Sequence, residues 1–211
     1  MYRSAPIISV IGTPGAGKST LLETIMQSNP SAYVVAHEPV ADWEDSGILK
    51  AFYNHPTRYA LAFQTIAVAT VAATLNRACT DAGDERIVIS ERDLQSSHFI
   101  FAQPLMEHYM NAWERETYQA LFDAAAASTP PATHYIWLDV SPEVCLKRIV
   151  NRNRPSERKL TLAQLTSMDT RIGAWAALPH IAERLITITE QQLSKITATI
   201  DAIITNLLGT E

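Results

Sequence analysis

An eight-residue segment near the amino terminus has the residue types and the spacing that bind a nucleoside triphosphate. It runs from Gly12 to Ser19 and reads Gly-Thr-Pro-Gly-Ala-Gly-Lys-Ser, between a short apolar run and a segment with helical periodicity. Glycines let backbone N–H groups approach a phosphate closely, and the positive end of the following helix favours negative charge there. Lys18 can bridge the terminal phosphates, and the Ser19 hydroxyl can ligate Mg²⁺. The segment predicts a P-loop, whose expected ATP-binding residues are Gly12, Thr13, Pro14, Gly15, Ala16, Gly17, Lys18, Ser19 and Thr20.

Three further side chains that could act on a phosphate acceptor follow expected strands. Glu38 comes just after the second expected strand, where a carboxylate can take the proton of an attacking hydroxyl. Glu91 and Arg92 come just after the third, where an acid can hold a metal and a guanidinium can neutralise transferred charge. Taken singly, such residues are more often solvated loop residues or surface ion pairs. Their shared position at strand ends predicts that they face the same site as Lys18.

The elements that must position these residues alternate between strands and helices along the whole chain. The strands are expected at residues 6–11, 33–36, 86–90, 134–139 and 184–189. The helices are expected at residues 19–27, 43–53, 57–79, 94–110, 113–127, 141–151, 160–177 and 190–208. The strands are mostly continuous apolar runs, which is typical of a parallel sheet covered on both faces. We therefore predict one α/β domain over residues 1–211, with a P-loop kinase fold, a five-stranded parallel sheet and helices on both faces.

Composition and charge narrow the classes of function. The chain has 211 residues and a net charge of −5, which argues against nonspecific binding to nucleic acid or an anionic membrane. Residues 147–159 nevertheless hold six of the 17 Lys and Arg residues, a cluster whose size suits a phosphate. The uncharged stretch 59–76 is rich in Ala and Thr and contains Gln64, so a buried helix is favoured over a membrane span. Two widely separated cysteines and no signal-like or transit-like start predict a cytoplasmic protein.

A set of motifs along the chain resembles the deoxyribonucleoside kinases, most closely the branch of mitochondrial thymidine kinase and the insect multisubstrate kinase. The motifs are Glu38-Pro39-Val40 with Trp43, Phe52-Tyr53, Phe63-Gln64, Glu91-Arg92 and the segment 138–149. Arg148, Arg152, Arg154 and Glu157 match the arginine-rich lid of that family, expected here at about residues 150–160. The resemblance extends from about residue 7 to residue 175. It implies that the three arginines bind the phosphates of ATP.

The resemblance also implies catalytic roles. Glu38 would be the general base on the 5′-hydroxyl of a deoxynucleoside. Arg92 would contact that hydroxyl and the developing charge, with Lys18 on the phosphates. Ser19 and Glu91 would ligate Mg²⁺. ATP and Mg²⁺ are therefore the expected cofactors.

A second group of residues would bind the nucleoside. The resemblance places Tyr53 and Glu157 at the 3′-hydroxyl, with Tyr53 also excluding a 2′-hydroxyl. It places Trp43 and Phe101 against the base and Gln64 at the base edge. An amide can donate and accept side by side, which suits the N3–H and O4 of thymine or the reversed pattern of cytosine.

The expected base pocket is small-sided and uncharged. Gln64, Ala67 and Val71 share one face of the long helix. Val71 and Ser97 stand where the branch that prefers cytidine and purines carries Arg and Asp, which favours thymidine or a broad pyrimidine range. Asp93 departs from the serine usual in the family and would add negative charge near the phosphates.

Two alternatives compete with this interpretation. Thymidylate kinase also carries a P-loop and a Glu-Pro after its second strand, but it normally has Asp-Arg in place of Glu91-Arg92. A kinase-like subunit without catalysis would have no need to retain Lys18, Glu38 and Arg92. The expected partner is a small-molecule deoxynucleoside, not nucleic acid or a membrane. The resemblance also implies a homodimer, formed by the helices after Arg92 and after residue 159.

Overall fold

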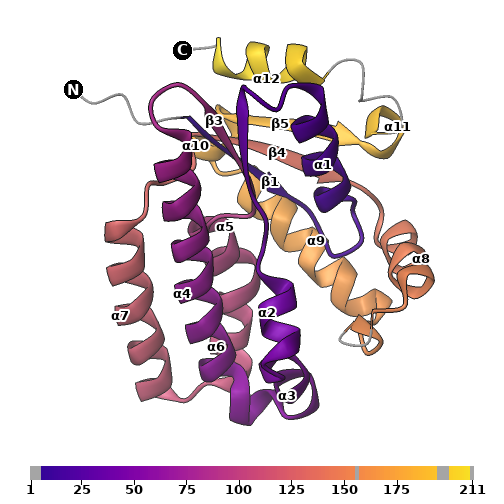
Figure 1. Ribbon diagram of the computed structural model, residues 1–211. Coiled ribbons are helices and arrows are strands. Elements are labelled where there is room, and N and C mark those ends of the chain that lie inside the picture. The colour runs from indigo at the N-terminus through magenta and orange to yellow at the C-terminus, as the bar shows by residue number, and fades with distance from the viewer. Residues whose placement is uncertain (1–5, 155–156, 194–199, 210–211) are drawn as a thin grey trace.

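The computed structural model describes residues 6–154, 157–193 and 200–209 (Figure 1). In these residues the chain forms a five-stranded sheet in the order β2-β3-β1-β4-β5, and every neighbouring pair is parallel. The strands are β1 (Ile7–Ile11), β2 (Tyr33–Ala36), β3 (Ile87–Glu91), β4 (His134–Asp139) and β5 (Leu185–Thr189). The predicted α/β class and the five parallel strands are confirmed.

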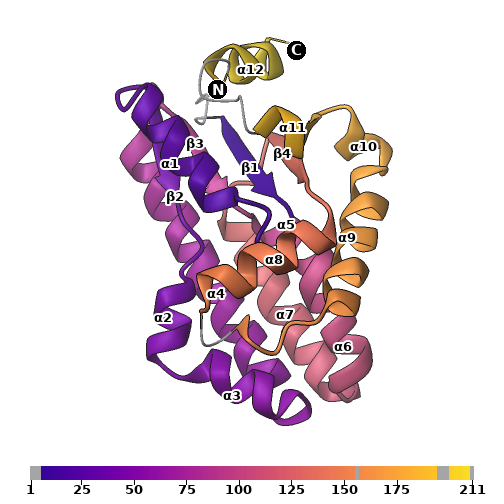
Figure 2. The same ribbon diagram turned by 90° about the vertical axis from the view of Figure 1, so that its right-hand side faces the viewer.

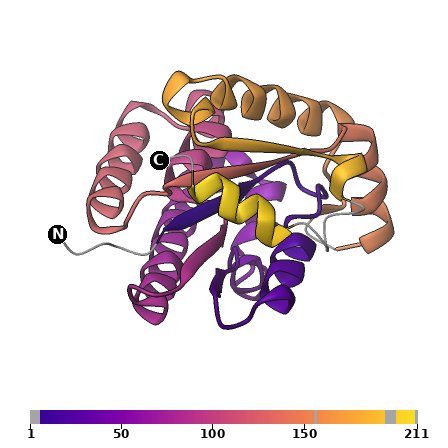
Figure 3. The ribbon, with the colours of Figure 1, turned by 90° about the horizontal axis from the view of Figure 1, so that it is seen from above.

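Helices connect the strands and cover both faces of the sheet (Figures 1 and 3). The helices are α1 (Lys18–Ser28), α2 (Val40–Asp45), α3 (Ile48–Asn54), α4 (Pro56–Ala82), α5 (Leu94–Ser97), the π-helical turn η1 (His98–Ala102), α6 (Gln103–Tyr109), α7 (Ala112–Ser128), α8 (Pro142–Arg152), α9 (Leu162–Ala176), α10 (Pro179–Ala182), α11 (Glu190–Leu193) and α12 (Ile200–Leu208).

The residues of β1 show how the sheet separates two hydrophobic cores. Successive side chains of a strand point to opposite faces. Ile8 and Val10 pack in the core that contains α1, α8 and α12. Ile7 and Ile11 pack in the core that contains α4, α7 and part of α9. Because both faces are covered, the strand is apolar except for the buried Ser9, in line with the short apolar run that the sequence indicated.

Three expected helices differ from those observed. The helix expected at 43–53 is two helices, α2 and α3, because Gly47 adopts a left-handed φ of 75° between them. The helix expected at 94–110 contains the π-helical turn η1 between α5 and α6. The helix expected at 190–208 appears as α11 and α12, and residues 194–199 lie outside the described residues.

The long helix α4 is the element that the sequence singled out as a membrane-span candidate. Among the described residues it alone is long and apolar enough, by length and composition, to cross a membrane. It packs against β2, β3, α3, α6 and α7, and its buried face includes Phe63, Val71 and Leu75. In this fold α4 serves as a core helix, and its cavity-facing side helps to form the candidate site.

Candidate active site

A cavity of about 750 Å³ opens at the carboxyl end of the sheet. Its walls come from the P-loop, the ends of β2 and β3, helices α2 to α4, η1 with α6, α8 with the segment after it, and α9. Most of the predicted site residues line it: Pro14, Gly15, Gly17, Lys18, Ser19, Thr20, Glu38, Trp43, Tyr53, Gln64, Ala67, Val71, Glu91, Arg92, Ser97, Phe101, Arg148, Arg152, Arg154 and Glu157. The carboxyl edge of a parallel sheet is where such folds bind ligands, because the connecting loops converge there.

The P-loop has the backbone geometry that its glycines permit. Gly15 has a φ of +84°, and a Cβ there would lie 2.5 Å from the carbonyl oxygen of Cys145. Side chains other than hydrogen are therefore excluded at this position. Gly12, Thr13 and Ala16 do not line the cavity. The carbonyls of Gly12 and Thr13 instead accept hydrogen bonds from Lys18 Nζ, each at 3.3 Å.

Lys18 lies buried at the centre of the site, with 6% of its side chain exposed. Burial and the neighbouring charge of Arg92 lower its pKa to about 8, against the opposing effect of Glu91 and Glu38. Its Nζ lies 4.0 Å from Glu91 Oε1. A P-loop lysine held in this way can exchange its contacts with the two carbonyls for contacts with the oxygens of a bound phosphate.

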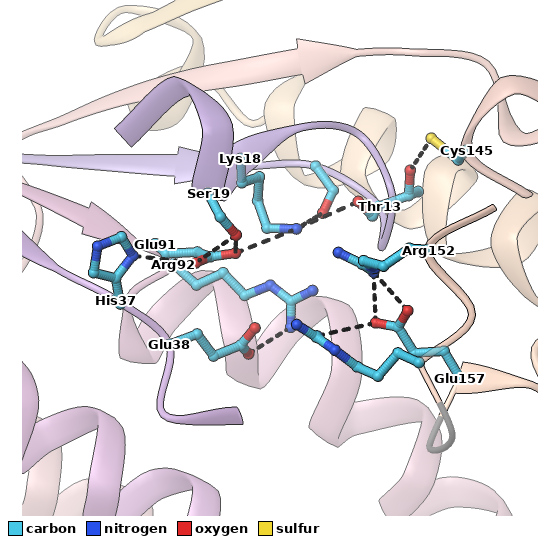
Figure 4. A network of polar contacts seen from close by, with 12 residues as sticks. Thr13, Lys18, Ser19, His37, Glu38, Glu91, Arg92, Cys145, Arg152 and Glu157 are labelled. Atoms are coloured by element: carbon cyan, nitrogen blue, oxygen red, sulfur yellow. Dashed lines mark hydrogen bonds and ion pairs between the residues drawn. The ribbon is translucent and has the colours of Figure 1, made fainter. Parts of the chain in front are cut away.

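Glu91 joins the P-loop to the end of β3 (Figure 4). Both of its carboxylate oxygens lie 3.2 Å from the hydroxyl of Ser19. Burial would raise the pKa of Glu91, but the contact with His37 and the charges of Lys18 and Arg92 outweigh it and lower the pKa to about 2. Glu91 is therefore ionised at neutral pH. An ionised carboxylate beside a hydroxyl, both oxygen donors, fits Mg²⁺, which binds few protein ligands and keeps phosphate and water in its shell.

His37 belongs to this site although the sequence analysis did not assign it. Its Nδ1 lies 3.9 Å from Glu91 Oε2, and 53% of its side chain is exposed. The interaction with Glu91 raises its pKa, against the effect of burial. The sequence feature that could have identified His37 as a site residue is its position directly before Glu38, at the end of a strand.

Glu38 and Arg92, which directly follows Glu91, form a close ion pair in the same cavity (Figure 4). Arg92 Nη1 donates to Glu38 Oε1 at 2.8 Å, and about a tenth of each side chain is exposed, 11% and 10%. The Arg92 guanidinium also lies over the ring of Phe101, 3.9 Å from its centroid. Arg92 has a left-handed φ of 70°, which a non-glycine residue adopts only under constraint. The buried Nε of Arg92 has no hydrogen-bond partner among the described residues.

Asp93 does not act where the sequence suggested. Its carboxylate caps α5 by accepting from the backbone N–H of Gln95 at 2.8 Å and of Ser96 at 3.2 Å. It also accepts from the Ser96 hydroxyl at 2.7 Å. Only 3% of Asp93 is exposed, and it does not line the cavity. The carboxylate of Asp93 thus caps α5 and does not form part of the cavity wall.

Arg152, Arg154 and Glu157 of the arginine-rich segment line the cavity. The chain after α8 leads to α9, which lies on the same side of the molecule (Figure 2). Arg152 Nη2 donates to both carboxylate oxygens of Glu157, at 2.7 and 2.5 Å, and Arg154 donates to the same carboxylate at 3.4 Å. Arg154 also lies 4.0 Å from Glu44 of α2, a contact that the sequence did not indicate. Residues 155–156 of the expected lid lie outside the described residues.

Arg148 is tied to the P-loop side of the cavity. It donates to the carbonyl of Ala16 at 3.1 Å and to Glu190 of α11 at 3.1 Å. Its side chain remains 39% exposed. A guanidinium fixed beside the phosphate loop can contact a bound nucleotide.

Aromatic side chains form the wall opposite the phosphate loop. Trp43 meets Phe63 edge-on with centroids 5.5 Å apart, and Phe63 stacks on Phe52 at 4.9 Å. Phe52 in turn contacts Tyr53 at 5.4 Å. Burial, followed by the charge of Glu157, raises the pKa of Tyr53 to about 12. The phenol therefore keeps its proton at neutral pH and can donate a hydrogen bond.

Two buried polar side chains of the cavity, on α4 and α5, could contact a ligand. Gln64 is 6% exposed and shares the cavity-facing side of α4 with Ala67 and Val71. Ser97 lines the same region, and its buried hydroxyl has no hydrogen-bond partner among the described residues. A buried amide beside a buried hydroxyl that has no partner is suited to bind the polar edge of a ligand.

Comparison with known proteins gives consistent matches over most of the chain. A family profile described as deoxynucleoside kinase matches residues 8–207. Deoxycytidine kinase of Mus musculus is 30% identical over 194 residues, which cover 80% of this chain and 74% of that protein. Deoxycytidine kinase of Homo sapiens is 29% identical with the same coverage. A protein of Fowlpox virus, named as a probable deoxycytidine kinase, is 29% identical over 170 residues, 80% of this chain and 70% of that protein.

Proposed function

The chain belongs to the deoxynucleoside kinase family, and we propose that it transfers the γ-phosphoryl group of ATP to the 5′-hydroxyl of a deoxynucleoside, with thymidine or a broad pyrimidine range as acceptor. Family membership makes it a kinase that phosphorylates nucleosides. The observation that carries the finer proposal is the ion pair of Glu38 and Arg92 in the cavity that also contains Lys18. A base and a cation thus share one enclosed space with the phosphate-binding loop.

Glu38 would accept the proton of the 5′-hydroxyl as that oxygen attacks the terminal phosphorus. Arg92 holds Glu38 at 2.8 Å, which orients the carboxylate before the substrate binds. The guanidinium offers further donors, including the unpartnered Nε, to the charge that develops on the transferred group. Most of the catalysis would come from positioning and charge stabilisation, as is general for phosphoryl transfer.

The donor would bind along the P-loop. Lys18 and the loop N–H groups would hold the phosphates, with Arg148, Arg152 and Arg154 closing on them from the other side. Ser19 and Glu91 would hold Mg²⁺, which when bound neutralises charge on the phosphates. Arg152 and Arg154 both donate to the carboxylate of Glu157. The negative charge of Glu157 offsets the repulsion between the two guanidinium groups at the cavity.

The nucleoside would lie between the aromatic wall and η1. Tyr53 and Glu157 would bind the 3′-hydroxyl, Trp43 and Phe101 would pack on the base, and Gln64 would pair with its edge. The uncharged side chains of Val71 and Ser97 support a pyrimidine over a purine.

Deoxycytidine is the second candidate acceptor. Relatives 27–30% identical to this chain are named deoxycytidine kinases. The amide of Gln64 supports either pyrimidine, because rotation of the amide exchanges its donor and acceptor. The acceptor range is thus the part of the proposal that a direct assay decides.

We further propose that the protein acts as a homodimer in the cytoplasm, with neither nucleic acid nor a membrane as a partner. The net charge of −5 supports the absence of nucleic acid and membrane partners. The resemblance to the family supports a dimer formed through α5, η1 and α6 with α9. Sedimentation at micromolar concentration tests the dimer.

A substrate panel tests the proposal. The purified chain is assayed with ATP and Mg²⁺ against the four deoxynucleosides, uridine and thymidine monophosphate. We expect 5′-monophosphates of thymidine and deoxycytidine to form fastest and uridine to react poorly. Consumption of thymidine monophosphate in place of thymidine would instead identify a thymidylate kinase. If none of these acceptors is phosphorylated, the proposed activity is wrong.

A further inference from the structure

The Thr70 hydroxyl accepts a hydrogen bond from a side chain that lines the cavity. Trp43 lines the cavity and is 5% exposed. Its indole Nε1 donates to Thr70 Oγ1 at 3.0 Å. The Thr70 hydroxyl in turn donates to the carbonyl of Ile66 at 2.7 Å. A hydroxyl has only one proton, so with that proton committed to the helix backbone its oxygen faces Trp43 as an acceptor.

The orientation of Trp43 matters because other rings depend on it. Trp43 meets Phe63 edge-on at 88°, and Phe63 stacks on Phe52 at 17°. Phe52 contacts Tyr53, which lines the other end of the same wall. Edge-on and stacked pairs have preferred geometries, so a rotation of Trp43 would disturb the packing of Phe63 and, through it, of the next rings.

We propose that Thr70 is a positioning residue for nucleoside binding, which holds Trp43 in the orientation that forms the base pocket. This inference rests on the proposed function, which packs the base against Trp43. Thr70 itself does not line the cavity. Without its oxygen, the buried indole N–H has no acceptor, and the indole gains other orientations. Binding of the nucleoside must then order the indole of Trp43 again, so the affinity for the nucleoside falls while the rate of the chemical step is unchanged.

The test compares three variants on one helix. Thr70→Val keeps the branched shape but removes the acceptor, and Thr70→Ser keeps the hydroxyl. Thr80→Val is the matched control, because the Thr80 hydroxyl donates to the Asn76 carbonyl at 3.0 Å at an exposed position further along α4. Thymidine and deoxycytidine binding is measured by calorimetry without ATP, and kcat and KM are measured with ATP.

We expect Thr70→Val to weaken nucleoside binding and raise the nucleoside KM about three- to tenfold, the factor for one net hydrogen bond. Its kcat and its KM for ATP should stay within about twofold of the wild type, because the phosphate side is untouched. Thr70→Ser and Thr80→Val should bind like the wild type. In a Trp43→Phe background, Thr70→Val should cause no further loss, since the donor is already absent.

Three results would overturn the inference. The first is nucleoside binding by Thr70→Val as tight as that of the wild type. The second is an equal loss in Thr80→Val, and the third is an additive loss in the Trp43→Phe background, since either would indicate a general helix effect. With any of these results, the proposed function still stands if the wild type binds and phosphorylates deoxynucleosides. If the wild type binds no deoxynucleoside, the role of Thr70 and the proposed function are both wrong.

Discussion

At the scale of single residues, Lys18 has an unusual environment that predicts a pH dependence. Burial and Arg92 lower its pKa to about 8, so the group loses its proton as the pH rises through about 8. Only the charged form attracts phosphate. We expect the affinity for ATP at fixed free Mg²⁺ to fall about tenfold from pH 7 to pH 9. Calorimetry at the two pH values measures this.

The matched control for this prediction is Lys18→Met. This variant should bind ATP weakly and with little change between pH 7 and pH 9. Equal affinity of the wild type at both pH values would show that Lys18 does not titrate in this range.

Tyr53 carries a second prediction at this scale. Its phenol, with a pKa raised to about 12, remains a donor at neutral pH beside Glu157. Tyr53→Phe should weaken binding of a deoxynucleoside about three- to tenfold, by the loss of one hydrogen bond. A 2′,3′-dideoxynucleoside should bind the wild type and Tyr53→Phe equally. If Tyr53→Phe weakens binding of both ligands to the same extent, Tyr53 does not contact the 3′-hydroxyl.

Several residue contacts could not be predicted from the sequence. Lys18 and Ser19 carry a local motif, and Glu38 was identified by its place after a strand. The contact of His37 with Glu91, and that of Glu44 with Arg154, join segments far apart in the chain. Such contacts depend on packing, which no local pattern encodes.

At the scale of the elements, α5 carries a prediction about stability. Asp93 caps this short helix with three hydrogen bonds and is almost fully buried. Asp93→Ala should lower the free energy of unfolding by about 1–2 kcal/mol, and Asp93→Asn by less. Chemical denaturation measures the loss. Because Asp93 does not line the cavity and its carboxylate caps α5, ATP affinity should not change. Tighter ATP binding by Asp93→Ala would show that its charge acts on the phosphates after all.

The elements also show where periodicity misleads. Residues 43–53 keep a helical pattern, but Gly47 adopts a left-handed conformation and divides them into α2 and α3. The apolar spacing of 94–110 is compatible with a helix, yet it conceals the π-helical turn that contains Phe101. Local hydrogen bonding, which the spacing of apolar residues does not report, decides both cases.

At the scale of the whole molecule, the parallel five-stranded sheet was the most predictable feature, whereas the order of its strands was not predicted. Strands buried on both faces are mostly apolar, so their runs and their alternation with helices indicated a parallel sheet. Topology then places the ends of β1, β2 and β3 at one edge, in the order β2-β3-β1. Glu38, Glu91 and Lys18 meet in one cavity for that reason. The acceptor base proposed here, by contrast, rests on a few side chains of the cavity, among them Gln64, Val71 and Ser97.

The central claim is that Glu38 removes the proton of the acceptor hydroxyl in the cavity that holds the phosphates of ATP. Glu38→Gln keeps an oxygen that can accept from Arg92 but removes the base. The direct measurement is single-turnover transfer of labelled γ-phosphate to thymidine and deoxycytidine, with Glu116→Gln, exposed on α7, as the control. We predict a rate lower by a factor on the order of 10²–10⁴ for Glu38→Gln, with nucleoside affinity almost unchanged. A rate close to that of the wild type would contradict the account.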